Sequence, residues 1–405
     1  KALLASVILM TLIPMARHGR LAMLDGSLVT SSLLLWTGWL SSRSVPWHGL
    51  LAGLGATGVL MLKPPALIGF LLITAVISRL DRHQSRWNAT ALAWVCAGIS
   101  PGLAWHGWHL AQRGSSALVM WGGQGFGRVA GVVGDSTGAF VMPLTEVLEG
   151  GWPWLLLLPL GIRIAWQQRG DCAGRWELGL LLGSAALVLP LRSQLPWYSH
   201  LLWPAIALLC SEGLHQVLIC GRPRWIGKLW MLMGAALLLA TLALMISSPS
   251  IALPRLALVC AGAGLVAGGR QLIQTTQRQR RRGLITLLMG WGAALLALWH
   301  SQLWLWELNE SWDPRPVASA IRELPNEAKI MLKGPTRPSL GWYANRKMLD
   351  ETDQVLSNHW VVSNKPPKGC EANGLQLRAT SGEEPWQLWF CPVSPESLEA
   401  DHEGQ

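Results

Sequence analysis

The chain has 405 residues, of which 51% are hydrophobic and only 14% charged, and it contains 25 tryptophans. These proportions exclude an ordinary soluble globular domain. The net charge of +10 is unevenly divided: residues 1–306 hold 23 Lys and Arg against 8 Asp and Glu, whereas residues 307–405 hold 10 against 15. No basic stripe interleaved with aromatic side chains lies outside the apolar runs, which argues against a nucleic-acid partner.

Apolar runs long enough to cross a bilayer recur through residues 1–306. We therefore predict an all-α polytopic membrane bundle with about eleven spans, followed by a separate domain at 307–405. The predicted spans cover residues 1–14, 27–41, 47–62, 64–78, 89–110, 151–167, 176–191, 196–215, 226–247, 251–269 and 284–306. The chain starts at Lys1 inside an apolar run, without a methionine, so we expect part of its start to be missing.

The loop charges orient these spans. If Lys1 is cytoplasmic, the loops on its side carry 16 Lys and Arg against 7 on the other side. The cytoplasmic loops of membrane proteins are enriched in Lys and Arg, so this orientation is favoured. It places a multi-pass protein in the inner or plasma membrane, with the C-terminal domain outside the cytoplasm.

The outer loops hold charges that topology does not require. Asp25 stands in "RLAMLDGSLV", shortly after Arg20, and is predicted in the first outer loop. A carboxylate near the hydrocarbon boundary is costly unless it is solvated, paired or bound to a cation. Two interpretations stay open here: Asp25 caps the next helix through its Asp-Gly-Ser turn, or it belongs to a site and is a candidate ligand for a divalent cation.

Cations follow on the same predicted face. Lys63 precedes two prolines in "GVLMLKPPALIGF", which predicts a helix start where a phosphate could bind. Arg128 stands in the long glycine-rich outer loop and Arg192 in "LRSQLPWYSHLLWPAIALL", with Gln194 and Tyr198. We predict that Lys63, Arg128, Arg192 and Tyr198 bind a phosphate, with Arg20 and Gln194 in support. The alternative for each arginine is an end-of-helix side chain that reaches the headgroups.

These segments, in this order, resemble the membrane glycosyltransferases of the protein O-mannosyltransferase and aminoarabinose transferase group, which have the GT-C fold. The resemblance rests on "RLAMLDGSLV", "GVLMLKPPAL", "GFGRVAG", "GGWPWLLLLPL" and "LRSQLPWYSHLLWPAIALL". It implies an enzyme that takes a sugar from a polyprenyl-phosphate donor on the outer face and transfers it, with inversion, to a lipid, glycan or protein.

The resemblance also implies roles for single residues. Asp25 matches an acid of the family, Lys63 a lysine and Arg128 an arginine. Asp25 would assist catalysis, orienting the acceptor or a metal, because the family's usual catalytic base lies in a first outer loop that has no counterpart here. The family's "KSKLPxY"-like stretch stands here as "RSQLPWY", so Arg192 keeps a charge and Gln194 loses one.

The tail alternates helix-like and strand-like pieces, which predicts a small α/β domain. Cys370 and Cys391 are its only cysteines and are candidates for a disulfide in an oxidising compartment. Two competing functions remain for the whole chain: a lipid or sugar transporter, and a non-catalytic truncated relative. Against the first, the spans carry few acids and show no internal repeat.

Overall fold

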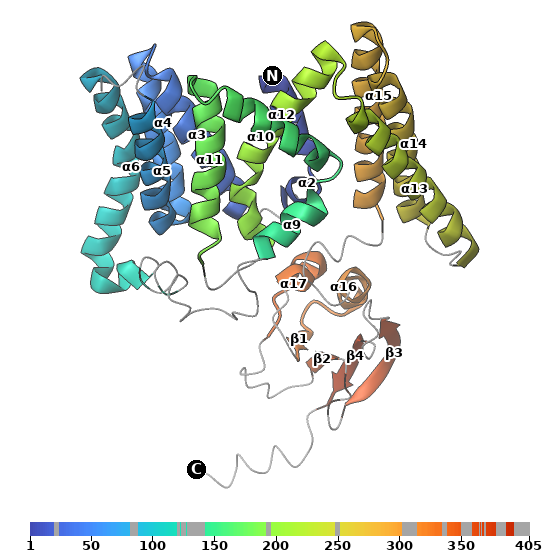
Figure 1. Cartoon of the computed structure of the whole chain (residues 1–405). Coiled ribbons are helices and arrows are strands. Elements are labelled where there is room, and N and C mark those ends of the chain that lie inside the picture. The colour runs from blue at the N-terminus through green and yellow to red at the C-terminus, as the bar shows by residue number, and fades with distance from the viewer. Residues whose placement is uncertain are drawn as a thin grey trace. The chain divides into compact units, whose positions relative to one another are not determined.

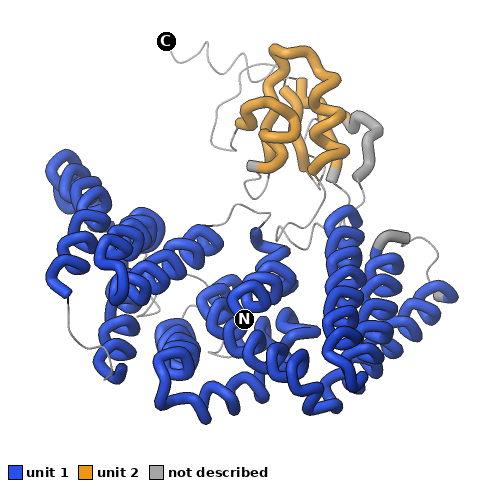
Figure 2. The backbone as a smooth tube through the Cα atoms, turned by 90° about the horizontal axis from the view of Figure 1, so that it is seen from above, with its two compact units in different colours: residues 1–301 blue, residues 302–405 orange. Residues whose placement is uncertain are grey.

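The computed structural model divides the chain into two compact units, Lys1–Ser301 and Gln302–Gln405 (Figure 2). The structure describes residues 1–19, 24–81, 88–119, 122, 127, 142–191, 196–247, 252–301, 314–333, 338–349, 359–363, 365, 367, 370–377 and 386–392. Each unit is considered by itself.

The first unit is a bundle of helices (Figure 1). Its α-helices are α1 (Ala2–Thr11), α2 (Ile13–Gly19), α3 (Leu24–Ser41), α4 (Gly49–Leu62), α5 (Pro64–Leu80), α6 (Ala89–Arg113), α9 (Met142–Gly150), α10 (Leu158–Gln167), α11 (Cys172–Val188), α12 (Trp203–Cys220), α13 (Trp225–Ser247), α14 (Ala252–Leu272) and α15 (Gln277–Trp299). Short 3-10 helices, η1 (Pro46–His48), η3 (Gly114–Leu118), η5 (Trp154–Leu157) and η6 (Pro196–Leu201), join them.

Every predicted span overlaps one of these helices or a bent pair of them. Among the described residues, three helices are long and apolar enough to cross a membrane singly: Trp203–Cys220, Trp225–Ile246 and Gln277–Trp299. Two bent pairs, α1 with α2 and α9 with the segment Trp154–Gln167, bring this number to five. The predicted fold class, a helical polytopic membrane bundle, is confirmed.

Two predicted boundaries were wrong. The last span was predicted over 284–306, but α15 begins at Gln277, so the "RQRRR" run forms its first turns instead of a loop. The run is accommodated because Arg280 donates hydrogen bonds to the carbonyls of Leu218 and Ile219, at the end of α12. Asp25 was predicted in a loop, yet α3 already begins at Leu24.

Tryptophans hold the centre of this unit together. Trp154, Trp203 and Trp230 are fully buried in one cluster that also takes residues from α1, α14 and α15. The indole N–H of Trp154 donates to the Thr11 hydroxyl at 3.0 Å, and that of Trp230 donates to the Pro153 carbonyl at 2.9 Å. The N–H of a buried indole usually finds a hydrogen-bond partner, and these two bonds connect α1, the start of η5 and α13.

Helices α4 and α6 approach closely because glycine faces glycine. A Cβ added at Gly53 would stand 2.3 Å from the Val95 carbonyl oxygen, and one at Gly98 would stand 2.5 Å from that of Leu50. Any side chain at either position would therefore push the two helices apart. Small residues at such crossings are typical of helix packing in membranes.

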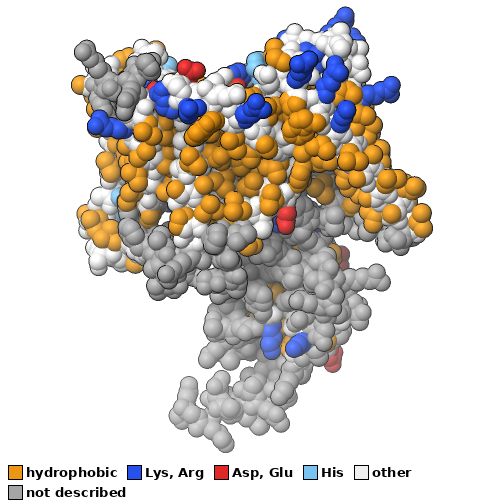
Figure 3. All heavy atoms as spheres, viewed as in Figure 1, with side chains coloured by type: hydrophobic (Ala, Val, Ile, Leu, Met, Phe, Trp, Pro, Cys, Tyr) orange, Lys and Arg blue, Asp and Glu red, His pale blue; other side chains and the backbone are white. Residues whose placement is uncertain are grey.

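Charged residues concentrate at one end of the helices, which we name the arginine-rich end after Arg43, Arg163, Arg175, Arg222 and Arg280. Figure 3 shows Lys and Arg side chains along this edge, above a belt of hydrophobic side chains. All five residues fall in loops or helix ends that the sequence assigns to the cytoplasmic side.

Asp81 ties three connections together at this end. Its carboxylate accepts from Arg43 at 2.6 Å and also pairs with Arg175, and its side chain is only 1% exposed. Burial acts to raise the pKa of Asp81, but hydrogen bonds from Arg43 and Cys172 and the charges of both arginines bring this pKa below its ordinary value. The carboxylate is therefore ionised, and it joins the α3–α4 connection, the end of α5 and the start of α11.

The second unit is a small α/β domain, as predicted. Helices α16 (Pro314–Glu323) and α17 (Pro338–Ala344) accompany the strands β1 (Lys329–Leu332), β2 (His359–Ser363), β3 (Glu371–Leu377) and β4 (Trp386–Cys391). The sheet order is β1-β2-β4-β3, with β1 parallel to β2 and the other pairs antiparallel. Its core packs Val317 and Ile321 of α16 against strand residues such as Ile330, and Cys370 is disulfide-bonded to Cys391.

Candidate active site

The candidate site begins with Lys63, the residue between α4 and α5. Two prolines occupy the first positions of α5, and Lys63 is its N-terminal cap residue with φ −145° and ψ 81°. Proline has no N–H to donate, and it disfavours a helical backbone at the residue before it. The helix α4 therefore ends before Lys63, and α5 begins directly after it. The predicted helix start is confirmed, and the turn presents the ammonium group at the junction of the two helices.

Asp25 lies opposite, in the first turn of α3. Its Oδ1 accepts a hydrogen bond from Lys63 Nζ at 2.6 Å, and the two side chains are 10% and 35% exposed. An ion pair this short with one buried partner is charge-assisted and worth more than a surface pair. The carboxylate of Asp25 is thus paired with a cation that stands 38 residues further along the chain.

Tyr198 adds an aromatic wall from η6. The Lys63 ammonium stands 5.3 Å from the centroid of the Tyr198 ring. A cation over a ring face at this distance is attracted by the negative charge of that face. Lys63 therefore contacts both a carboxylate and a ring, and three separate helical segments meet around it.

Two buried histidines lie beside this group. His200 Nδ1 lies 2.5 Å from the Trp197 carbonyl, and His200 Nε2 lies 3.1 Å from His18 Nδ1. The carbonyl can only accept, so Nδ1 of His200 carries its proton and Nε2 accepts from His18. Both rings are nearly inaccessible, at 5% for His18 and 1% for His200. His200 lies close enough to Asp25 and Lys63 for their charges to act on its ring. His18, His200, Asp25 and Lys63 therefore form one group.

Neither His18 nor His200 was among the site residues predicted from the sequence. Their positions offered a signal, since His18 stands two residues before the segment "RLAMLDGSLV" and His200 stands two residues after Tyr198. Neither segment by itself shows that the two rings meet across 182 residues.

The other predicted site residues lie outside the described residues. These are Arg20, Arg128, Arg192 and Gln194. Within the part of the chain that the structure describes, no group of three or more His, Cys, Asp and Glu could hold a metal ion. A divalent cation on Asp25 stays a prediction, and in the structure this carboxylate pairs with lysine.

The geometry suits the recognition of a phosphate group. A lysine ammonium is a compact cation that binds phosphate as a point charge. Here it stands beside a carboxylate that can exchange partners, because an arriving anion competes with Asp25 for Lys63. The ion pair thus brings together a cation, Lys63, that can bind a phosphate and a carboxylate, Asp25, that can accept a proton.

The two units together define a polytopic helical membrane protein with a small appended α/β domain. The structure is similar to that of ArnT from Cupriavidus metallidurans bound to undecaprenyl phosphate, with a TM-score of 0.63 and 13% identity over 96% of this chain and 79% of that chain. It also matches the apo state of the same protein, with a TM-score of 0.49 and 14% identity. The predicted GT-C fold is thereby confirmed. The sequence matches no protein-family model and none of the curated proteins compared with it.

Proposed function

We propose that the chain is an integral membrane glycosyltransferase that takes a sugar from a polyprenyl-phosphate donor and transfers it to a lipid, glycan or protein acceptor on the outer face of the membrane. The observation that carries the proposal is the Asp25–Lys63–Tyr198 group, built by three segments at one end of a GT-C bundle. Support also comes from the similar structure of ArnT, which holds undecaprenyl phosphate.

The reaction would need a fixed cation at the leaving phosphate. When the bond between the anomeric carbon and the phosphate oxygen breaks, negative charge grows on the phosphate, and a preorganised ammonium stabilises it. Lys63 is positioned for this role, with its cation held by the Tyr198 ring. The predicted phosphate ligands Arg128 and Arg192 would share the charge.

Asp25 would act on the acceptor side. Once the donor phosphate takes over Lys63, the Asp25 carboxylate is free to orient the acceptor hydroxyl, to accept its proton or to bind a divalent cation. The family resemblance assigns the role of principal base to a different residue, so Asp25 is proposed as an assisting carboxylate.

A transfer assay tests this proposal. Membranes containing the protein are incubated with polyprenyl phosphates that carry radiolabelled hexoses or pentoses, and the label leaving the donor lipid is counted. Lys63→Met should lower transfer by about a hundredfold or more, as the loss of one transition-state charge contact does. Asp25→Asn should lower it as well.

The chain offers matched controls at the arginine-rich end. Lys228 is exposed on α13, and Asp171 is exposed before α11 and makes no side-chain cap bond. Lys228→Met and Asp171→Asn should leave transfer at the wild-type rate. Equal transfer by wild type, Lys63→Met and Asp25→Asn would defeat the proposal.

A further inference from the structure

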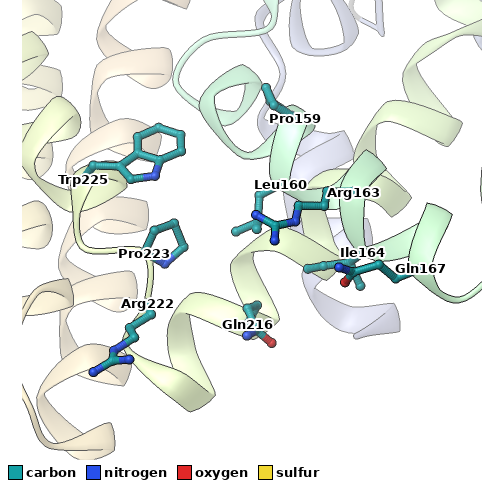
Figure 4. A pocket seen from close by; sticks show the side chains of 9 residues that line it. All are labelled: Pro159, Leu160, Arg163, Ile164, Gln167, Gln216, Arg222, Pro223 and Trp225. Atoms are coloured by element: carbon teal, nitrogen blue, oxygen red, sulfur yellow. The ribbon is translucent and has the colours of Figure 1, made fainter.

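A second candidate site lies far from Asp25 and Lys63. A cavity of about 450 Å³ opens between α10, the end of α12 and the start of α13 (Figure 4). Gln216 lines it, thirteen residues after the beginning of α12, whereas η6 with Tyr198 precedes that helix. At 1.5 Å per residue this separation is about 20 Å along the helix axis, so the cavity is at the arginine-rich end and is not part of the candidate active site.

The cavity carries positive charge from two walls. The Arg163 side chain of α10 points across the cavity toward the segment 222–225, whereas the Arg222 side chain stands at the rim and points away from Arg163 (Figure 4); both arginines are exposed. Among the described residues neither forms an ion pair, and the cavity lining contains no acid. Arg163 therefore points its guanidinium into this space, and Arg222 adds positive charge at its rim. Guanidinium groups also match phosphate oxygens in geometry.

Two neutral donors complete the polar part. The amides of Gln167 and Gln216 line the same cavity, from α10 and α12 respectively. Each amide offers two N–H groups. Arg163, Gln167 and Gln216, from α10 and α12, therefore bring donor side chains to the lining of one space, which suits a phosphodiester with several acceptor oxygens.

The remaining wall is apolar, which argues for a lipid in preference to a soluble anion. Leu160 and Trp225 line the cavity beside the arginines, and Trp225 is 45% exposed. Helix α13 then continues with exposed Leu232 and Leu239, at 65% and 67%. Tryptophan is typical of the membrane interface, and a leucine-covered helix surface adjoining a basic pocket gives acyl chains a place next to their headgroup.

We propose that this cavity binds the phosphate headgroup of an anionic glycerophospholipid from the leaflet at the arginine-rich end. The headgroup phosphate lies against Arg163, with the charge of Arg222 at the rim of the cavity, and the acyl chains run along α13. The bound lipid bridges α10 and α12 to α13, and so stabilises the attachment of α13 to the bundle.

Lipid retention tests this site on the full chain. The protein is purified in detergent, incubated with phosphatidylglycerol or with zwitterionic phosphatidylcholine, and bound lipid is counted by native mass spectrometry. The double variant Arg163→Gln/Arg222→Gln should bind phosphatidylglycerol about tenfold more weakly, since it loses the charge-assisted contact of Arg163 and the positive charge of Arg222 at the rim. Arg163→Lys/Arg222→Lys should keep most of the binding, because the charge remains.

Two further arms decide between the sources of phosphate. The control Arg224→Gln/Arg270→Gln removes two exposed arginines of the same end that do not line the cavity, and it should bind phosphatidylglycerol as wild type does. Soluble glycerol 1-phosphate should not displace the lipid. The proposal is overturned if the cavity variant retains wild-type binding, if the control loses as much, or if glycerol 1-phosphate displaces the lipid at equal concentration.

Discussion

At the scale of single residues, Lys63 is the centre of the candidate site. It is fixed by two prolines in sequence and by Asp25 and Tyr198 in space. The carboxylate and the ring make different contacts with the ammonium, so their contributions can be separated experimentally. In the proposed function, the carboxylate gives up Lys63 to the donor phosphate, whereas the ring keeps its contact.

This difference predicts how Tyr198 responds to substitution. Tyr198→Phe keeps the ring face and should bind the donor lipid within about threefold of wild type, whereas Tyr198→Leu should weaken binding about tenfold, the loss expected for a partly desolvated cation–π contact. Binding of a fluorescent polyprenyl phosphate to the purified protein measures both. Equal weakening of both variants would instead assign the tyrosine hydroxyl a direct contact with the phosphate.

At the scale of helices, connections at the two ends of the bundle have different tasks. The arginine-rich end is locked by the Asp81 carboxylate, which pairs with arginines from the α3–α4 connection and from α11. The Asp25 end joins α2, α3, α5 and η6 through groups that can exchange partners. The Asp81 contacts hold their connections together at one end, while the other end is the one where we propose that the donor lipid binds.

Asp81→Asn should therefore destabilise the bundle. Removing one partner from a buried ion pair leaves uncompensated charge, and here two arginines lose their acid, at a cost of about 3 kcal/mol in the free energy of unfolding. Thermal unfolding in detergent measures this as a lower midpoint temperature. The exposed Asp171→Asn serves as control, with a change of about 0.5 kcal/mol or less. A wild-type midpoint for Asp81→Asn would contradict the structural role.

The helices were largely predictable from local sequence, while the contacts between them were not. The "KPP" motif was sufficient to place a helix start at Lys63, because proline acts on its immediate neighbours. The pairing of Lys63 with Asp25 could not be predicted, because the two residues stand 38 positions apart and local patterns indicated a separate role for each. The pairing of His18 with His200 was missed for the same reason. The helical position of Arg280 was not predicted either. A run of arginines indicates a loop in the sequence, and here it is helical because Arg280 donates hydrogen bonds to carbonyls at the end of a distant helix, α12.

At the scale of the whole molecule, the fold decides at which end of the first unit each proposed site lies, and the charge of the loops predicts the side of the membrane. Consecutive helices alternate direction, so Asp25, Lys63 and Tyr198 fall at one end of the first unit and the loops of Arg43, Asp81 and Arg175 at the other. Positive loops favour the cytoplasm. The proposed chemistry is therefore expected on the outer face, and the proposed lipid cavity on the cytoplasmic face.

Cysteine accessibility tests this orientation. In a chain whose five free cysteines are replaced, single cysteines are introduced at exposed Ser116, which follows α6, or at exposed Ser44, which follows α3. A membrane-impermeant maleimide should label Ser116→Cys in intact cells and Ser44→Cys only after lysis. The reverse pattern would contradict the predicted orientation.

Photo-crosslinking tests the central claim, that a polyprenyl phosphate binds at Lys63, most directly. A polyprenyl phosphate carrying a diazirine next to its phosphate is bound to the purified wild-type protein, irradiated, and the labelled peptides are identified by mass spectrometry. The account predicts label in the peptides that contain Asp25, Lys63 and Tyr198, and its loss in Lys63→Met but not in Lys228→Met. Label confined to peptides with Arg163 and Arg222, or unchanged in Lys63→Met, would contradict it.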